Sequence, residues 1–254
     1  MAKVARLALH SWEELKRDLV PLLFDREPFR SGQYLFRGCG DADWSLISSF
    51  DRRFGSLPSD KRMAIWKALL REFREQSAEH GVAREILADD KALLAFAQHH
   101  GLPTRLLDWS LSPYVAAFFA FRQALRSPDA TGQVALWVLD TRSSAWSAEM
   151  GVELVAPFAS GNLRLRNQSG RFTYARTPHL TLEEYVSYVP TDESPLTQVT
   201  LPSIEAIRAM PDLDAMGTHA MNLFPDWEGL AEGVAIRLEL EALASSEAPV
   251  SWPS

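Results

Sequence analysis

Hydrophobic residues recur three and four positions apart in two stretches of the first half of the chain, which is the spacing of an amphipathic helix. The stretch 84–100, REILADDKALLAFAQHH, predicts one helix that ends at Gly101. The stretch 58–81, PSDKRMAIWKALLREFREQSAEHG, predicts a longer helix, because Gly81 is a natural C-terminal stop. The apolar face of this longer helix consists of Met63, Trp66, Leu69, Leu70 and Phe73.

Two further helices are marked by their first residues. Ser11 and Glu14 have the spacing of a capping box and predict a short amphipathic helix, SWEELKRDLVPLLF. Ser112 followed by Pro113 joins a good N-cap to a good first helical residue, and it predicts a buried helix that runs to Arg126. Helical patterns return in the C-terminal third of the chain, over 203–210, 212–224 and 227–243.

Other segments have the composition of strands. QYLFRG is aromatic and stops at a glycine, so it predicts a strand that ends at Arg37–Gly38. GQVALWVLD, residues 132–140, is an apolar run bounded by turn residues. Helices and strands in this order indicate an α+β protein with helices flanking a small mixed sheet, and residues 245–254 read as a loose tail. Shorter strands are predicted at 152–157, 163–174 and 197–202.

Composition narrows the class of protein. The 254 residues are 46% hydrophobic and 23% charged, enough for one sizeable core, and the expected organisation is a single domain over 1–254. The net charge of −7 gives no global attraction to nucleic acid or to an anionic membrane. No run is apolar enough to span a bilayer and the N-terminus lacks a signal-peptide layout, so the expected location is the reducing cytoplasm.

The single cysteine, Cys39, excludes an internal disulfide and a cysteine-rich zinc site. A lone cysteine is usually a small buried hydrophobe, and a nucleophilic role for Cys39 would need a histidine base beside it. His99 and His100 are adjacent and point in different directions on a helix, so they cannot both bind one metal ion, and no metal is expected. The chain also lacks the glycine-rich fingerprints of nucleotide-binding loops and the nucleophile elbow of hydrolases.

Polar residues crowd between the helix that ends at Gly101 and the helix that begins at Ser112. Two interpretations are open for this segment, which is expected to be a loop. As a folding device, Arg105 and Asp108 would form a local ion pair, and His99 or His100 would cap the preceding helix. As one wall of a binding site, the segment would present side chains and helix N–H groups to an anion. The clustering of histidines with Ser110 and Ser112 favours a site.

Arg37 stands at the end of an aromatic strand and is followed by Gly38. A rigid cation with five N–H donors beside a glycine suits a phosphate or pyrophosphate, because glycine lets a ligand approach the backbone. The alternative is a surface ion pair.

Several blocks occur in order from Gln33 to Tyr174. The blocks are YLFRG, WSLISSFDR, FAQHHGLPTRLLDWSLSPYVAAFFAF, GQVALWVLD and NQSGRFTY. A further segment near the C-terminus, NLFPDWEGLA, shows a weaker similarity. In these blocks the chain resembles the FRG domain family, named for its Phe/Tyr-Arg-Gly motif. Their order in turn resembles the ADP-ribosyltransferase fold, in which NAD binds in a cleft of a small split mixed or antiparallel sheet flanked by helices.

The resemblance implies NAD as substrate and gives roles to individual residues. Arg37 matches an arginine or histidine at a strand end that contacts the NAD phosphates or ribose. Ser110 matches a serine that holds the nicotinamide ribose, and His99 would position or deprotonate the acceptor. The other residues expected to contact NAD are Gly38, His100, Thr104, Arg105, Asp108 and Ser112.

At the third motif of such transferases, this chain departs from the pattern of the family. It is usually a glutamate on a later strand, whereas the corresponding block here offers Gln168. A glutamine can accept a hydrogen bond from a ribose hydroxyl but supplies no negative charge to a developing cation. Three alternatives follow: Gln168 acts in an altered catalyst, an acid such as Asp108 or Glu228 completes the site, or the protein binds without catalysing.

The resemblance implies transfer of ADP-ribose from NAD to a protein or nucleic acid, or NAD hydrolysis. The family's distribution adds a bacterial or phage setting, as a toxin or phage-defence effector, with a neighbour-encoded regulator as a further partner. The alternative is a non-catalytic sensor module that binds a nucleotide or carbohydrate. A nuclease ranks last, because no acid cluster is visible. A basic groove would indicate a nucleic-acid acceptor, lined by Arg164, Arg166 and Arg171.

Overall fold

A seven-stranded mixed sheet forms the centre of the molecule, with strand order β1-β7-β4-β2-β3-β6-β5. The structure is a computed structural model that describes residues 4–24, 32–126, 132–156, 170–191 and 194–244. β1 pairs with β7 in parallel, and every other registered pair is antiparallel. The strands are β1 (Ala5–Ala8), β2 (Tyr34–Cys39), β3 (Leu106–Ser110), β4 (Gln133–Asp140), β5 (Val152–Val155), β6 (Gly170–Ala175) and β7 (Leu196–Pro202).

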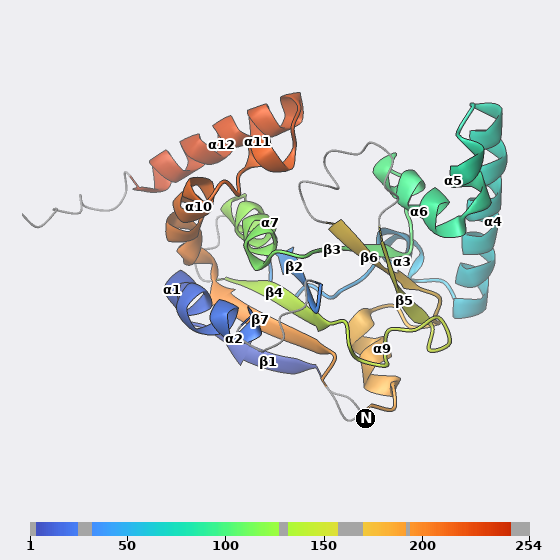
Figure 1. Cartoon of the computed structure of the whole chain (residues 1–254), viewed down its shortest axis with the longest axis horizontal. Helices are drawn as coiled ribbons and strands as arrows, with labels where there is room; N and C mark the ends of the chain where they lie inside the picture. Colours follow the sequence, from blue (N-terminus) through green and yellow to red (C-terminus); the bar gives the residue numbers. More distant parts are fainter. Residues whose placement is uncertain (1–3, 25–31, 127–131, 157–169, 192–193, 245–254) are drawn as a thin grey trace, which may run out of the picture.

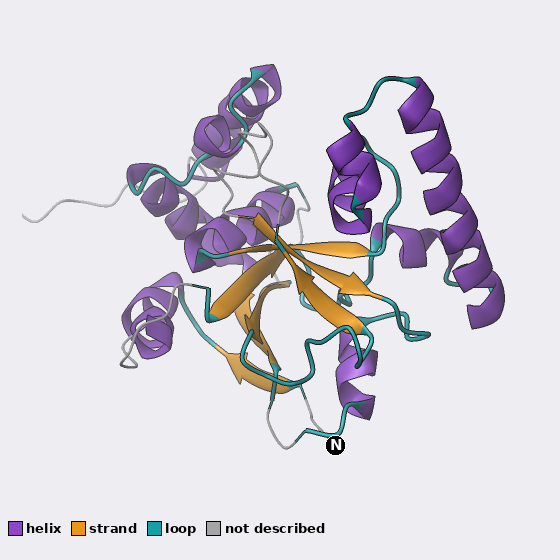
Figure 2. Ribbon diagram, turned by 45° about the vertical axis from the view of Figure 1, so that its right-hand side comes forward, coloured by secondary structure: helices purple, strands orange, loops and turns teal. Residues whose placement is uncertain are grey.

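Helices flank this sheet on both sides, which confirms the α+β class predicted from the sequence. Figures 1 and 2 show α4, α5 and α6 grouped at one end of the sheet, and α7, α10, α11 and α12 at the other. A π-helical segment joins α1 to α2 over Leu15–Leu19. The helices are α1 (Trp12–Glu14), α2 (Val20–Phe24), α3 (Ser49–Phe54), α4 (Ser59–Glu79), α5 (Arg84–Ala88), α6 (Asp90–His99), α7 (Pro113–Leu125), α9 (Leu182–Tyr188), α10 (Ala206–Ala215), α11 (Ala220–Leu223) and α12 (Trp227–Ala244).

The sheet is split at its centre. β2 and β3 share one registered pair, Phe36 with Ser110, whereas β2 pairs with β4 and β3 pairs with β6 along their full lengths. The two parts of the sheet, β1-β7-β4-β2 and β3-β6-β5, therefore diverge from a single point of contact. Continued register would set Gly38 opposite Asp108, and the structure has no ladder there.

Apolar side chains from both faces of the sheet form three clusters. Alternation along β2 sends Phe36 to the side covered by α7 and α10, and Leu35 to the side covered by α9. A third cluster joins β6 to α3, α4 and α6 through Phe172, Phe50 and Trp66. The split between β2 and β3 therefore lies where the helix groups of the two ends meet the sheet.

Most predicted elements are confirmed, and the differences have local causes. Ser11 Oγ accepts the Glu14 N–H as a capping box requires, but the Glu14 carboxylate accepts from the His10 N–H instead of from Ser11. The single helix predicted over 84–100 is two helices, because Asp89 is extended and caps α6 through the Lys91 N–H. The elements that the sequence patterns did not predict are β1, α3, β3 and α9.

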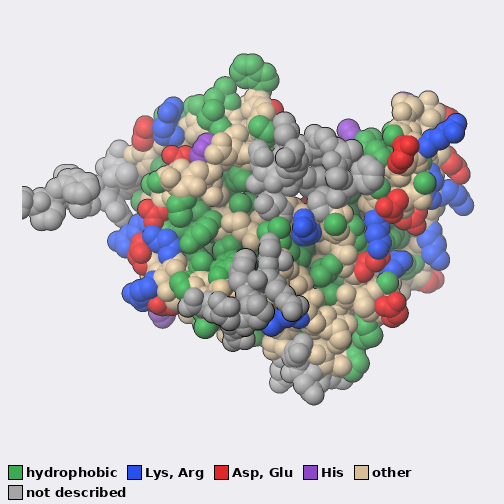
Figure 3. All heavy atoms as spheres, viewed as in Figure 1, with side chains coloured by type: hydrophobic (Ala, Val, Ile, Leu, Met, Phe, Trp, Pro, Cys, Tyr) green, Lys and Arg blue, Asp and Glu red, His purple; other side chains and the backbone are tan. Residues whose placement is uncertain are grey.

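Apolar side chains are exposed along the outer face of α12. Trp227 is 84% exposed, and Leu230, Val234 and Leu238 follow it at helical spacing. Figure 3 shows hydrophobic atoms beside acidic and basic ones over α11 and α12, and acidic and basic atoms interspersed over α4. Within the described parts of the chain, no helix is both long and apolar enough to cross a membrane.

We expect Gly38→Ala to lower the free energy of unfolding by about 3 kcal/mol, because a Cβ there would lie 1.9 Å from the carbonyl oxygen of Ala116 in α7. Gly233→Ala is the matched control, since its Cβ would meet nothing closer than Met221 Cγ at 3.7 Å, and alanine favours the helix interior by about 0.5–1 kcal/mol. Urea unfolding of both variants measures the difference. Equal midpoints would show that the contact between β2 and α7 is not tight.

Candidate functional site

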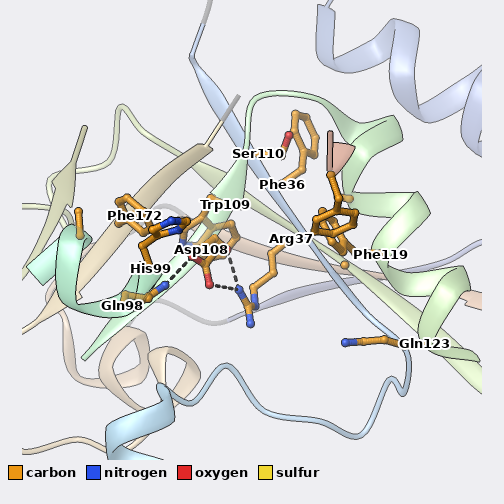
Figure 4. A pocket seen from close by; sticks show the side chains of 14 residues that line it. Phe36, Arg37, Gln98, His99, Asp108, Trp109, Ser110, Phe119, Gln123 and Phe172 are labelled. Carbon is orange, nitrogen blue, oxygen red and sulfur yellow. Dashed lines mark hydrogen bonds and ion pairs between the residues drawn. The ribbon is translucent and has the colours of Figure 1, made fainter. Parts of the chain in front are cut away.

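A pocket of about 420 Å³ opens where β2 and β3 separate. Its volume lies within the range of small-molecule sites, which are typically apolar clefts with a few polar groups. Figure 4 shows α6 at one end of the pocket, α7 at the other and Arg37 between them. The lining residues are Phe36, Arg37, Gly38, Ala95, Gln98, His99, Asp108, Trp109, Ser110, Ala116, Phe119, Gln123, Phe172 and Phe224.

Arg37 bridges the two strands at the split. Its Nη1 donates to the backbone carbonyl of Asp108 at 2.8 Å, and the same nitrogen lies 3.7 Å from the Asp108 carboxylate. The Arg37 side chain thus donates to a backbone carbonyl that would have accepted a hydrogen bond from β2 if the pairing of β2 with β3 had continued. This contact fixes the planar guanidinium in the wall of the pocket. Among the described lining residues, Arg37 is the one arginine or lysine and Asp108 the one carboxylate.

A chain of hydrogen bonds holds the Asp108 carboxylate in place. Gln98 Nε2 donates to Asp108 Oδ1 at 2.6 Å, and Thr104 Oγ1 donates to Gln98 Oε1. Thr104 is fully buried, and its own N–H donates to Ser49 Oγ at 3.1 Å. The Asp108 side chain is still 62% exposed and faces the pocket. The structure therefore gives Thr104, expected to contact NAD, the position of a residue that orients Gln98.

The two histidines have different positions. His99 is the last residue of α6 and lines the pocket, with its ring 5.1 Å from that of His100. His100 is the C-cap residue of α6 and is exposed, and its ring lies 4.4 Å from that of Phe96. The structure brings His99 to the pocket and leaves His100 outside its lining.

Ser110 and Ser112 form the turn between β3 and α7. Ser110 Oγ accepts the Ser112 N–H at 3.0 Å, and Ser112 Oγ caps α7 by accepting the Val115 N–H at 3.4 Å. Ser110 lines the pocket, whereas Ser112 does not. The predicted helix start at Ser112 and Pro113 is confirmed.

The predicted ion pair between Arg105 and Asp108 is wrong. The segment is not a loop but leads into β3, where positions three apart point to opposite faces of the sheet. Arg105 is directed into the core, where Nε lies 2.9 Å from Asp51 Oδ2 and Nη2 donates to the Thr177 carbonyl at 2.9 Å. Its side chain is fully buried, so it does not reach the pocket expected to hold NAD.

Gly38 lines the pocket, but its lack of a side chain serves packing. A Cβ at this position would collide with the backbone of α7. The expected reason for a glycine, the close approach of a ligand, is therefore not needed to explain it. Cys39 follows on the other side of β2 and is buried, and this burial raises the pKa of its thiol. A buried thiol with a raised pKa fits the small hydrophobe and not the nucleophile.

Several expected residues fall elsewhere. Gln168, Arg164 and Arg166 lie outside the described residues, so their predicted roles stay predictions. Arg171 lies on β6, and its Nη1 donates to the Gly170 carbonyl at 2.9 Å. Glu228 is exposed in the first turn of α12 and is not part of the pocket lining.

Sequence reasoning missed the residues that shape the two ends of the pocket. Gln98 directly precedes the histidines, and its signal is a polar residue that ends an otherwise apolar helix face. Phe119 and Gln123 are four positions apart and therefore share one face of α7. Phe172 and Phe224 come from β6 and from the turn between α11 and α12, and no local pattern could have placed them beside α7 or α6.

The comparisons with known proteins bear on the segment that carries this pocket. The family model of the FRG domain matches residues 32–129, which run from just before β2 to just after α7. This range contains Arg37, Gln98 and Asp108, and the resemblance to the FRG domain family is confirmed there. Searches among curated proteins and among solved structures found no match.

Proposed function

We propose, taking the FRG domain at residues 32–129 as premise, that the pocket at the split of the sheet binds NAD and cleaves its nicotinamide–ribose bond. The ADP-ribose would pass to a macromolecular acceptor or to water. The observation that carries the proposal is the pairing of one fixed guanidinium with one exposed carboxylate in the same aromatic-lined cleft. Arg37 and Asp108 provide that pairing across the split.

Arg37 suits the pyrophosphate of NAD. A guanidinium binds phosphate oxygens through a planar fork of N–H donors, and the bond to the Asp108 carbonyl holds the plane of that fork. Lysine in this place would keep the charge and lose the fork. The resemblance to the ADP-ribosyltransferase fold gives the same role to Arg37.

Asp108 suits the reacting ribose. In the proposed step the bond between ribose C1 and the nicotinamide nitrogen breaks, and the electron pair leaves with nicotinamide, which becomes neutral. Positive charge develops on the ribose ring, and a fixed carboxylate nearby stabilises it. The acceptor, or water, then forms the new bond to C1 and loses its proton, for which His99 lies in the pocket wall. Asp108 thereby supplies the negative charge that Gln168 lacks.

Nicotinamide release from NAD tests the proposed function. We expect wild-type protein to release nicotinamide, and Arg37→Ala to release it about 100-fold more slowly at NAD concentrations well below saturation, because a charged contact that holds the phosphates before and during the reaction is lost. Arg37→Lys is expected to lie between the two. Arg84→Ala, which removes an exposed arginine at the start of α5, is the control for folding and should behave as wild type.

One observation favours a second function, a sensor that binds a nucleotide or carbohydrate without turnover. Gln98 and Arg37 already engage the Asp108 carboxylate, and an aromatic cleft with amide and carboxylate groups also suits sugars. This alternative predicts that NAD or a sugar raises the melting temperature of the wild type while no nicotinamide appears. Nicotinamide release that depends on Arg37 would exclude the sensor. If the wild type shows no nicotinamide release and no binding of NAD or a sugar, both functions are contradicted.

A further inference from the structure

The α7 end of the pocket is built differently from the end that holds Asp108. Phe119 and Gln123 extend from α7 (Figure 4), and Phe224, from the turn after α11, also lines the pocket. The rings of Phe119 and Phe224 meet edge to face, with centroids 5.9 Å apart. Two aromatic rings and one amide therefore wall this end.

Contacts outside the pocket fix the position of Phe224. The guanidinium of Arg122 lies over the Phe224 ring, 5.1 Å from its centroid. Arg122 and Arg126 both pair with Glu232 of α12. This network clamps α12 onto α7, so the C-terminal helices complete the aromatic wall.

The orientation of the Gln123 amide is determined by a backbone group. The Gly40 N–H donates to Gln123 Oε1 at 2.8 Å. Because a backbone N–H can only donate, the oxygen of the amide must face Gly40, and the amide nitrogen is left at the other side. Figure 4 shows the end of this side chain pointing from α7 toward the middle of the pocket. Gln123 therefore directs its N–H donors toward a ligand, while its oxygen faces Gly40.

We propose that Phe119, Phe224 and Gln123 form a nucleobase subsite that binds the adenine of NAD. This inference rests on the proposed function. Aromatic rings stack on the face of a base, and the Gln123 N–H donors match ring-nitrogen acceptors on its edge. The proposed function sets the reacting ribose and its nicotinamide beside Asp108, and Arg37 lies between the two ends of the pocket, where the pyrophosphate would bind (Figure 4). The adenine then lies at the α7 end of the pocket.

Gln123→Glu separates this role from a structural one. The glutamate keeps an oxygen for the Gly40 N–H and replaces the amide nitrogen by a second acceptor, which repels a ring nitrogen. We expect adenosine monophosphate to bind about tenfold more weakly to the variant, because a hydrogen bond is lost and an acceptor faces an acceptor. Nicotinamide mononucleotide, which lacks the adenine, should bind within about twofold of wild type. Calorimetric titration of both compounds measures the two values.

Phe119→Leu provides a second variant that does not touch Gly40. It keeps an apolar side chain on α7 and removes the ring, so adenosine monophosphate should again bind about tenfold more weakly. The melting temperature of each variant without ligand shows that the fold is kept. Loss of affinity for both mononucleotides alike would mean a general disturbance of the pocket and would overturn the subsite.

The outcomes separate the subsite from the proposed function. Wild-type affinity for adenosine monophosphate in both variants, with NAD still cleaved, overturns the subsite and leaves the function standing. Weakened binding of adenosine monophosphate with no cleavage of NAD by wild type supports the subsite and contradicts the transfer reaction. If wild type binds neither mononucleotide nor NAD, both proposals are wrong.

Discussion

Replacing Asp108 with asparagine is expected to slow nicotinamide release about 100-fold while the affinity for NAD stays within about threefold of wild type. The asparagine keeps an oxygen that can accept from Gln98 Nε2, and the backbone carbonyl bound by Arg37 is unchanged. What it removes is the negative charge, which is needed only when the ribose becomes cationic. An interaction that matters in the transition state alone changes the rate and not the binding of substrate.

The measurement is the rate of nicotinamide release at saturating NAD, together with the dissociation constant of NAD from calorimetry. Asp214→Asn removes an exposed carboxylate of α10 and is the matched control. A variant that cleaves NAD at the wild-type rate would show that Asp108 is not the charge that stabilises the reacting ribose. The acid would then have to come from elsewhere in the chain.

Asp51→Asn is expected to lower the free energy of unfolding by about 3–5 kcal/mol. Asp51 is 1% exposed and lies between two buried arginines, with Arg105 Nε at 2.9 Å and Arg62 Nε at 3.4 Å. The substitution leaves both guanidinium groups in the core without a counter-charge. Arg105 also donates to the Thr177 carbonyl, and Arg62 to the Leu57 carbonyl at 3.2 Å, so α3, α4 and the end of β6 are joined through this carboxylate.

Denaturant unfolding of wild type, Asp51→Asn and Asp18→Asn tests this expectation. Asp18 pairs with Arg17 at 2.7 Å, but both side chains are more than half exposed. Solvent screens such a pair, so its loss should cost less than about 1 kcal/mol. Similar losses for the two variants would show that the buried cluster does not hold the helices against the sheet.

The sequence predicted those elements whose signals are local. The helical period over 58–81, the cap at Ser112 and the apolar run 132–140 each lie within one element and need no partner to be recognised. Arg37 was recognised in the same way, from an aromatic run that ends at glycine. The structure places Arg37 in the lining of the pocket, and its role at a phosphate stays a prediction.

The rest depended on contacts between distant parts of the chain. β3 carries no clear alternation, because Leu106 packs against α3 and α4 while Leu107 and Trp109 pack on the other face. Without that strand, Arg105 and Asp108 were read as neighbours in a loop. The true partner of Arg105 is Asp51, 54 positions away, and only the folded sheet brings the two together.

The residues at the two ends of the pocket could not be predicted for the same reason. Gln98 reaches Asp108 because α6 packs beside β3, and Phe224 reaches Phe119 because α12 is clamped onto α7. Each contact joins two elements that are connected by a turn or a crossover. The hydrophobic periodicity of the sequence does not show the path of such a connection. A single sequence shows the residue types and leaves their pairing open.

The structure of the protein with an NAD analogue that cannot be cleaved, in which carbon replaces the ribose ring oxygen, tests the central claim most directly. The claim predicts the pyrophosphate on the Arg37 guanidinium and the ring carbon that bears nicotinamide beside the Asp108 carboxylate. The analogue bound away from the split between β2 and β3, or Arg37 without a contact to phosphate, would contradict it.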